Sequence, residues 1–203
     1  IAPRLHAMRV GRVIARPFAG EIGAFERTGN RKDYAMTPPQ PVLSNWLQDA
    51  GHPVIGIGKI SDIFSGQGLD HSLTGSDMVL MQHLKDQFAQ AADGSFVFAN
   101  FVEFDSLYGH RRDVAGYARA LEWFDRALAS LLAAMKPDDL LILTADHGND
   151  PTWPGTDHTR ERVPVLCAGM GPKPLGLLGF EDVAATVATY LNVTPKGQGK
   201  SFL

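Results

Sequence analysis

Residues 95–104 read Ser-Phe-Val-Phe-Ala-Asn-Phe-Val-Glu-Phe, a run that is almost continuously apolar. Such a run is typical of a strand in a parallel sheet whose two faces are both covered. After the polar segment 105–113, apolar side chains recur every three or four residues from Val114 to Met135, which predicts a long amphipathic helix. A second apolar run follows at residues 140–144. This order predicts an α/β fold with a mostly parallel sheet and helices on both faces.

The same alternation continues on both sides of this unit. Helical spacing or short apolar runs predict, in chain order, a helix at 42–50, a strand at 53–58, a helix at 81–91, a strand at 163–168 and a helix at 183–191. Residues 1–33 differ, because they contain one strand-like stretch, 10–15, and no helical period. We therefore expect residues 1–33 to form a separate small element beside the main body at 34–203.

Composition limits the possible function classes. The chain has 203 residues, of which 44% are hydrophobic and 20% are charged, as in an ordinary globular α/β domain. The net charge of −3 predicts no general attraction to nucleic acid or to a membrane surface. No run reaches the roughly 18 apolar residues that a membrane-spanning helix needs. The single cysteine, Cys167, excludes an internal disulfide, fits a cytoplasmic protein and is expected to be a buried structural thiol.

Histidines and carboxylates gather where two predicted strands end. Asp105 and His110 follow the first strand, Asp146 and His147 follow the second, and His158 lies in the next loop. Because ligands of open parallel sheets bind at the carboxyl ends of the strands, we expect these side chains to lie close together.

Imidazole and carboxylate together are typical ligands of divalent first-row cations, and oxygen-rich sets favour Mn²⁺ or Mg²⁺. Five candidate ligands exceed what one tetrahedral site needs, which favours two ions that could hold a phosphate between them. The alternative is that these are ordinary solvated or capping pairs. Taken alone, Asp150 and Asp157 would be interpreted in that way.

Two longer motifs point to a family. Residues 146–152, Asp-His-Gly-Asn-Asp-Pro-Thr, and 155–164, Gly-Thr-Asp-His-Thr-Arg-Glu-Arg-Val-Pro, closely resemble bacterial phosphopentomutases. Asp-His-Gly alone would indicate only the wider alkaline-phosphatase superfamily. Segments 104–113, 30–34 and 56–62 also resemble the family, so that the resemblance extends from about Val10 to Leu203.

The resemblance implies an alkaline-phosphatase-like core and a role for each strand-end residue. Asp146 and His147 would bind one metal ion, and Asp105, His110 and His158 would bind the second. The ions would be Mn²⁺, with Mg²⁺ or another divalent cation possible. The implied enzyme is a cytoplasmic isomerase of nucleotide and pentose phosphate metabolism. It moves a phosphate between C1 and C5 of ribose or deoxyribose through a phosphothreonine, and a sugar bisphosphate activates it.

Three basic residues are candidates for binding the pentose phosphate substrate. Arg12, Arg27 and Lys59 lie in segments that resemble the family's substrate-phosphate positions, although each could equally be a solvated surface charge. Arg111 and Arg112 could contact phosphate or could simply precede the long helix.

The chain also departs from the family pattern. The family's first aspartate ligand and its nucleophilic threonine have no match here, so we expect both to lie in a segment before Ile1. Residues 1–33 would then be the returning end of an inserted cap domain, and 34–203 the C-terminal part of the metal-binding core. The chain alone is expected to be inactive without that segment. The alternatives are another superfamily member, such as a phosphoglycerate mutase or a phosphatase, and a non-catalytic remnant that binds metal or sugar phosphate.

Overall fold

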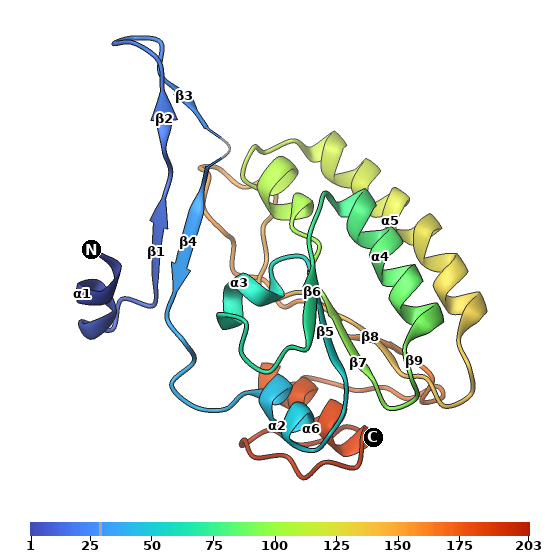
Figure 1. Cartoon of the computed structure of the whole chain (residues 1–203). Coiled ribbons are helices and arrows are strands. Elements are labelled where there is room, and N and C mark those ends of the chain that lie inside the picture. Colours follow the sequence, from blue (N-terminus) through green and yellow to red (C-terminus); the bar gives the residue numbers. More distant parts are fainter. Residues whose placement is uncertain (29) are drawn as a thin grey trace.

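The computed structural model describes residues 1–28 and 30–203, and it describes Arg27 through its backbone alone. Figure 1 shows the elements, which in chain order are α1 (Ala2–Ala7), β1 (Arg12–Ala15), β2 (Phe18–Ala19), β3 (Glu26–Arg27), β4 (Lys32–Ala35), α2 (Leu43–Asp49), β5 (Val54–Ile57), α3 (Ile60–Phe64), β6 (His71–Leu73), α4 (Asp77–Gln90), β7 (Phe96–Ala99), the π-helix η1 (Phe104–Gly109), α5 (Val114–Ala134), β8 (Leu141–Leu143), β9 (Leu166–Ala168) and α6 (Phe180–Tyr190).

The predicted parallel sheet is confirmed. Its central strand, β5, is buried along its whole length and pairs in parallel with β6 on one side and β7 on the other. Ile55 and Ile57 pack against Leu80 of α4. On the opposite face of the strand, Gly56 lies against Ile60 of α3, where an added Cβ would be 3.4 Å from the isoleucine side chain. Because strand side chains alternate between faces, these contacts show that helices cover both sides of the sheet.

The long helix predicted after residue 113 is also confirmed. It is α5, and its apolar face contributes Leu128 and Leu131 to a cluster with Met81 of α4. The helix begins at a capping residue, since the Asp113 carboxylate accepts the backbone N–H of Gly116 at 2.8 Å. Figure 1 shows α4 and α5 side by side against the sheet.

Two predicted strands differ from the structure. The strand expected over 95–104 ends at Ala99, although the N–H of Asn100 still donates to the carbonyl of Ile57 in β5 at 3.0 Å. Beyond it, the Asp77 carboxylate accepts the N–H groups of Val102 and Glu103, each at 3.1 Å. The strand expected over 163–168 is β9, which pairs with β8 in an antiparallel direction. No helix lies between β8 and β9, and a crossover of that kind is what parallel pairing requires.

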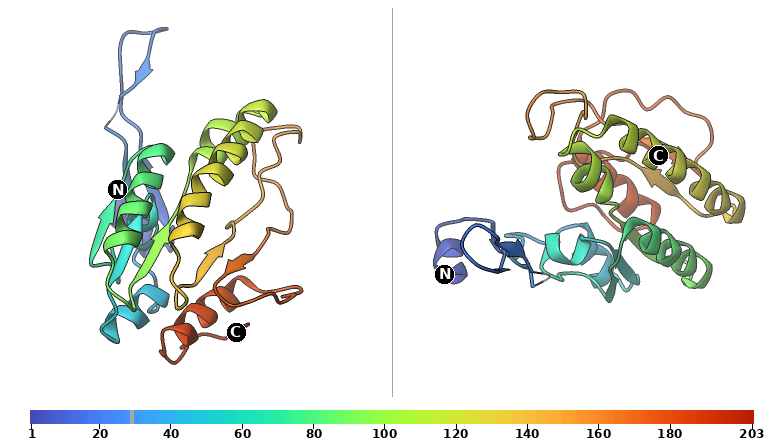
Figure 2. Two further views of the ribbon diagram at one scale, coloured as in Figure 1. Left: turned by 90° about the vertical axis from the view of Figure 1, so that its right-hand side faces the viewer. Right: turned by 90° about the horizontal axis from the view of Figure 1, so that it is seen from above.

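The N-terminal 35 residues form an arm that projects from the body (Figures 1 and 2). Two short antiparallel pairs build it, β1 with β4 and β2 with β3. No residue of this arm is buried, as far as its side chains are described. The expectation of no helix in this region is wrong, because α1 spans six residues at its start. The arm meets the body where the Ser65 hydroxyl donates to the carbonyl of Ala35 at 3.1 Å.

The C-terminal segment completes the body. Thr186 of α6 is fully buried, and its hydroxyl donates to the carbonyl of Asp182 and accepts the backbone N–H of Phe202. Cys167 in β9 is half-buried rather than buried, and burial raises the pKa of its thiol. None of the helices in the described part of the chain is both long and apolar enough to cross a bilayer.

Candidate metal centre

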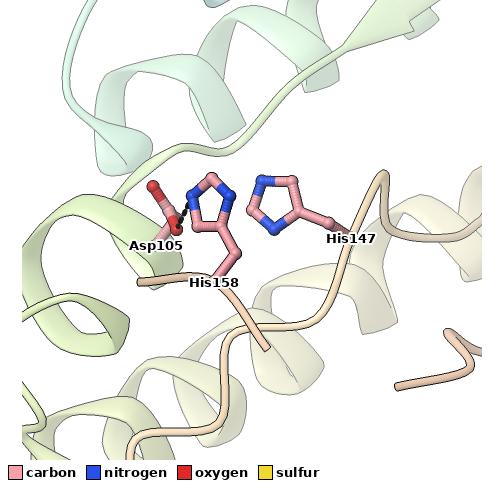
Figure 3. Close-up of side chains that lie close together, drawn as sticks. All are labelled: Asp105, His147 and His158. Atoms are coloured by element: carbon pink, nitrogen blue, oxygen red, sulfur yellow. Dashed lines mark ion pairs between the residues drawn. The ribbon is translucent and has the colours of Figure 1, made fainter. Parts of the chain in front are cut away.

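Three of the five predicted ligands converge at the strand ends (Figure 3). Asp105 lies in η1, shortly after β7, whereas His147 and His158 lie in the loop between β8 and β9. One possible donor atom from each of the three lies within 4.8 Å of the other two. A carboxylate oxygen and two imidazole nitrogens at this spacing are a donor set that suits a divalent first-row cation.

Asp105 is the centre of this cluster. Its Oδ1 is 3.3 Å from Nε2 of His158, and its Oδ2 is 3.3 Å from Nε2 of His110. The side-chain amide of Asn149 donates to Oδ1 at 2.6 Å. The two oxygens of one carboxylate thus contact two predicted ligands and a buried amide, and these contacts define its orientation.

The imidazole rings lie against one another. The rings of His147 and His158 are stacked with 3.8 Å between their centroids and an interplanar angle of 19°. The centroids of the His110 and His158 rings are 4.8 Å apart. His158 therefore lies between the other two histidines, and four of the five predicted ligands form one group of contacts.

The fifth predicted ligand, Asp146, lies at the edge of this group. Its side chain is 75% exposed, and its Oδ2 is 3.5 Å from Nε2 of the adjacent His147. It is not part of the set of three donors that converge within 4.8 Å. The division of the five residues between two ions stays a prediction.

A turn of π-helix brings Asp105 and His110 together. The backbone N–H of His110 donates to the carbonyl of Asp105 at 2.9 Å, which is a hydrogen bond across five residues. Such turns are uncommon and are frequently found at functional sites. Gly109 is also required here, because an added Cβ would lie 2.5 Å from the side-chain amide nitrogen of Asn149.

Sequence analysis gave no role to Asn149, although it stands inside the motif at 146–152. Its side chain is one of four buried polar groups among the described residues. A buried amide needs hydrogen-bond partners, and Asn149 has them in Asp105 and in the guanidinium of Arg112. The only sequence feature that could have indicated a role for Asn149 was its position within the motif at 146–152.

Asp77 was also missed, and it supports the segment that leads to Asp105. It is 4% exposed and is the first residue of α4. Besides accepting two amides from Val102 and Glu103, it donates its own backbone N–H to the Glu103 carboxylate at 3.2 Å. Burial raises the pKa of the Asp77 carboxyl to about 6, and the nearby charge of Glu103 acts in the same direction.

The three predicted phosphate-binding residues lie outside the cluster. Arg12 forms an ion pair with Asp33, and its side chain is 46% exposed. Lys59 lies 3.3 Å from Asp62 and is 42% exposed. The side chain of Arg27 lies outside the described part of the structure. Neither ion pair includes a residue of the metal cluster.

Comparison with known proteins agrees with this geometry. Residues 6–195 match the model of a family described as the metalloenzyme superfamily. The chain is also similar to proteins named phosphopentomutase from Chromohalobacter salexigens (52% identical), Chelativorans sp. (54%) and Yersinia pseudotuberculosis (53%), in each case over 96% of the chain. The chain spans about half the length of these curated relatives, 49% in each case.

These similarities confirm the resemblance that the sequence motifs indicated. They also confirm the alkaline-phosphatase-like fold class that the resemblance implied. The family match extends from the first helix of the arm into the segment that follows α6. It therefore includes every residue of the cluster around Asp105. The chain belongs to the metalloenzyme superfamily.

Proposed function

We propose that this chain works as part of a phosphopentomutase, an isomerase that moves a phosphate between C1 and C5 of ribose or deoxyribose. The observation that carries the proposal is the convergence of Asp105, His147 and His158 in a chain so similar to proteins of that name. The same convergence would be unexpected for ordinary solvated pairs, since the three residues come from two separate strand ends.

The residues fit a pair of Mn²⁺ ions, with Mg²⁺ or another divalent cation as alternatives. Asp105, His110 and His158 would hold one ion, while Asp146 and His147 would contribute to the other. Such ions, when bound, polarise a phosphoryl group and lower the pKa of an attacking group.

Arg12, Arg27 and Lys59 would bind the phosphate of the pentose substrate. Lys59 precedes α3, and the base of the arm contacts Ser65 at the end of the same helix, whereas β3, which carries Arg27, lies toward the far end of the arm (Figure 1). Exposed ion pairs such as Lys59 with Asp62 contribute only about 0.2–1 kcal/mol. A phosphate could therefore replace Asp62 as the partner of Lys59 at little cost.

The nucleophilic threonine would come from outside this chain. Two hydroxyls near the cluster are already engaged within their own loop: Thr152 donates to Asp150 at 2.7 Å, and Thr159 donates to Glu161 at 2.8 Å. A segment outside this chain is therefore the proposed source of the nucleophile. We further propose that a sugar bisphosphate activates the enzyme and that it is located in the cytoplasm. Residues 1–33 would belong to a cap portion, and residues 34–203 to the core.

The test uses the chain itself and a chimera that joins it to the remainder of the Chromohalobacter salexigens relative. Conversion of ribose 1-phosphate to ribose 5-phosphate is followed by phosphorus NMR with Mn²⁺ and a sugar bisphosphate present. We expect activity in the chimera, none in the chain alone, and none in a chimera that carries His158→Ala. Activity on 3-phosphoglycerate but not on ribose 1-phosphate would contradict the proposal and indicate a different member of the superfamily.

Metal content is measured separately on the chain purified with and without Mn²⁺. Bound ion that disappears in His158→Ala supports the site. A chain that binds metal while its chimera turns over no phosphate ester would point to a non-catalytic metal-binding domain.

A further inference from the structure

Arg112 donates hydrogen bonds to two loops that are distant in the sequence. Its Nε donates to the carbonyl of Gly155 at 2.6 Å, and its Nη2 to the carbonyl of Asp157 at 2.7 Å. Its Nη1 shares two N–H groups among three acceptors: the carbonyls of Gly109 and Asp150 at 3.0 and 2.9 Å, and the side-chain oxygen of Asn149 at 2.7 Å. All three nitrogens of the guanidinium therefore contact the protein.

The acceptors of these hydrogen bonds lie beside the predicted ligands. Gly109 directly precedes His110, and Asp157 directly precedes His158. Asn149 in turn donates to Asp105 at 2.6 Å. One side chain thus connects the loop that carries Asp105 and His110 to the loop that carries His147 and His158.

The backbone of Arg112 adds a second observation. Its φ is +56°, a left-handed conformation that favours glycine and that a long side chain rarely adopts. The residue nevertheless is an arginine, and its N–H donates to the carbonyl of Gly109 at 3.1 Å as the chain leaves η1. At Arg112 this uncommon conformation accompanies a side chain whose three guanidinium nitrogens all donate hydrogen bonds.

We infer that Arg112 is a positioning residue that assembles the two ligand-bearing loops into one site before a metal ion binds. A guanidinium suits this task because its planar fork of N–H donors can bind several carbonyl oxygens in fixed directions. The inference rests on the proposed function only in treating Asp105, His110, His147 and His158 as metal ligands. The guanidinium faces the protein's own carbonyls, so this role differs from both roles considered for Arg112 from sequence, a phosphate contact and a residue that simply precedes the helix.

The neighbouring arginine provides a matched control. Arg111 is exposed, and within the described residues it forms no hydrogen bond or ion pair through its side chain. Arg111→Ala removes the same charge from the same turn without removing a contact between the loops.

The first arm of the test measures amide hydrogen exchange in the complete, metal-free chain. In Arg112→Gly, which suits the left-handed backbone, the amides of Asp150 and Thr159 should exchange at least about tenfold faster, while the amides of β5 keep their protection. Arg111→Ala should leave all of them unchanged.

Unchanged exchange at Asp150 and Thr159 in Arg112→Gly would overturn the inference. Loss of protection in β5 as well would mean that Arg112→Gly affects the whole fold. Arg112→Lys would then be measured instead, because a lysine retains the charge but cannot reach all five acceptors.

The second arm measures the dissociation constant for Mn²⁺ by calorimetry. Loss of a group that orients metal ligands typically weakens affinity about 10- to 100-fold, and we expect that loss in Arg112→Gly but not in Arg111→Ala. Millimolar guanidinium should restore part of the affinity of Arg112→Gly and none in His158→Ala, where a ligand itself is missing. Affinity of Arg112→Gly equal to that of the unaltered chain would contradict the inference. If the unaltered chain bound no Mn²⁺, the proposed function would fail, whereas the exchange result would still decide the role of Arg112.

Discussion

The metal loops and the N-terminal arm are both exposed parts of the molecule, and both contain residues that sequence analysis assigned to function. They differ in how they are attached. Asp105 contacts Asn149 and two histidines, and Asp77 binds the segment just before it to the buried start of α4. The arm has no buried residue among those described, and the Arg12 side chain forms an ion pair with Asp33 of the neighbouring strand.

This difference shows that a functional side chain is positioned by the number of independent contacts between its segment and the core. The loops at 104–112 and 146–158 are joined by several hydrogen bonds, so the predicted ligands that they carry lie close together. The arm depends on local strand pairing, and Arg12 and Arg31 are each oriented by an ion pair with Asp33. The following substitutions and measurements test this difference between the two regions.

The largest effect is expected from Asp105→Ala. The substitution removes the carboxylate that contacts both His110 and His158 and leaves the Asn149 amide without its acceptor. Mn²⁺ affinity, measured by calorimetry, should fall by at least about 100-fold. Arg12→Ala, in the arm, should leave this affinity unchanged. An equal loss in both variants would remove the distinction between the two regions.

Asp77→Ala should destabilise the body of the protein without touching a metal ligand. It leaves the partly buried N–H groups of Val102 and Glu103 without that acceptor, at a cost of about 2 kcal/mol in the free energy of unfolding. Urea unfolding followed by fluorescence or circular dichroism measures this cost. A loss below about 0.5 kcal/mol would show that the Asp77 contacts do not anchor the segment before Asp105.

The titration of Asp77 should also make the free energy of unfolding depend on pH. The pKa of Asp77 is raised from 3.8 to about 6 in the folded state, so the folded state binds more protons than the unfolded state between these values. Its favourable contribution is fully present below pH 3.8 and is lost as the pH rises through about 6. Asp77→Asn should flatten this part of a stability curve measured by urea unfolding. A curve identical to that of the unaltered chain would contradict the assignment.

The smallest effect is expected in the arm. Burial acts to raise the pKa of the Asp33 carboxyl, but hydrogen bonds and charges from Arg12 and Arg31 outweigh it and lower the pKa below 3.8. The contribution of these pairs is therefore present at neutral pH and is lost as the pH falls through the lowered value. Amide chemical shifts along β1 and β4 should change below about pH 4, while those of β5 stay constant. Because the Arg12 side chain is exposed, Arg12→Ala should cost less than about 1 kcal/mol.

Much of the fold was predictable because its main elements are encoded locally. The apolar period from Val114 to Met135 corresponds to α5, and the short run at 53–58 corresponds to β5. The short elements α1, α3 and β6 were not predicted, since three to six residues offer too little period to recognise. The direction of β9 was also missed, because it depends on the path of the whole loop between 144 and 165.

Sequence alone was enough to identify which strand ends hold carboxylates and histidines, and which family those motifs resemble. The arrangement of these groups followed from the tertiary contacts. Asn149, Asp77 and Arg112 act on residues more than twenty positions away in the chain, through hydrogen bonds that exist only once the strands are side by side. Such long-range contacts leave no periodic pattern in a sequence, whereas a helix face or a buried strand does.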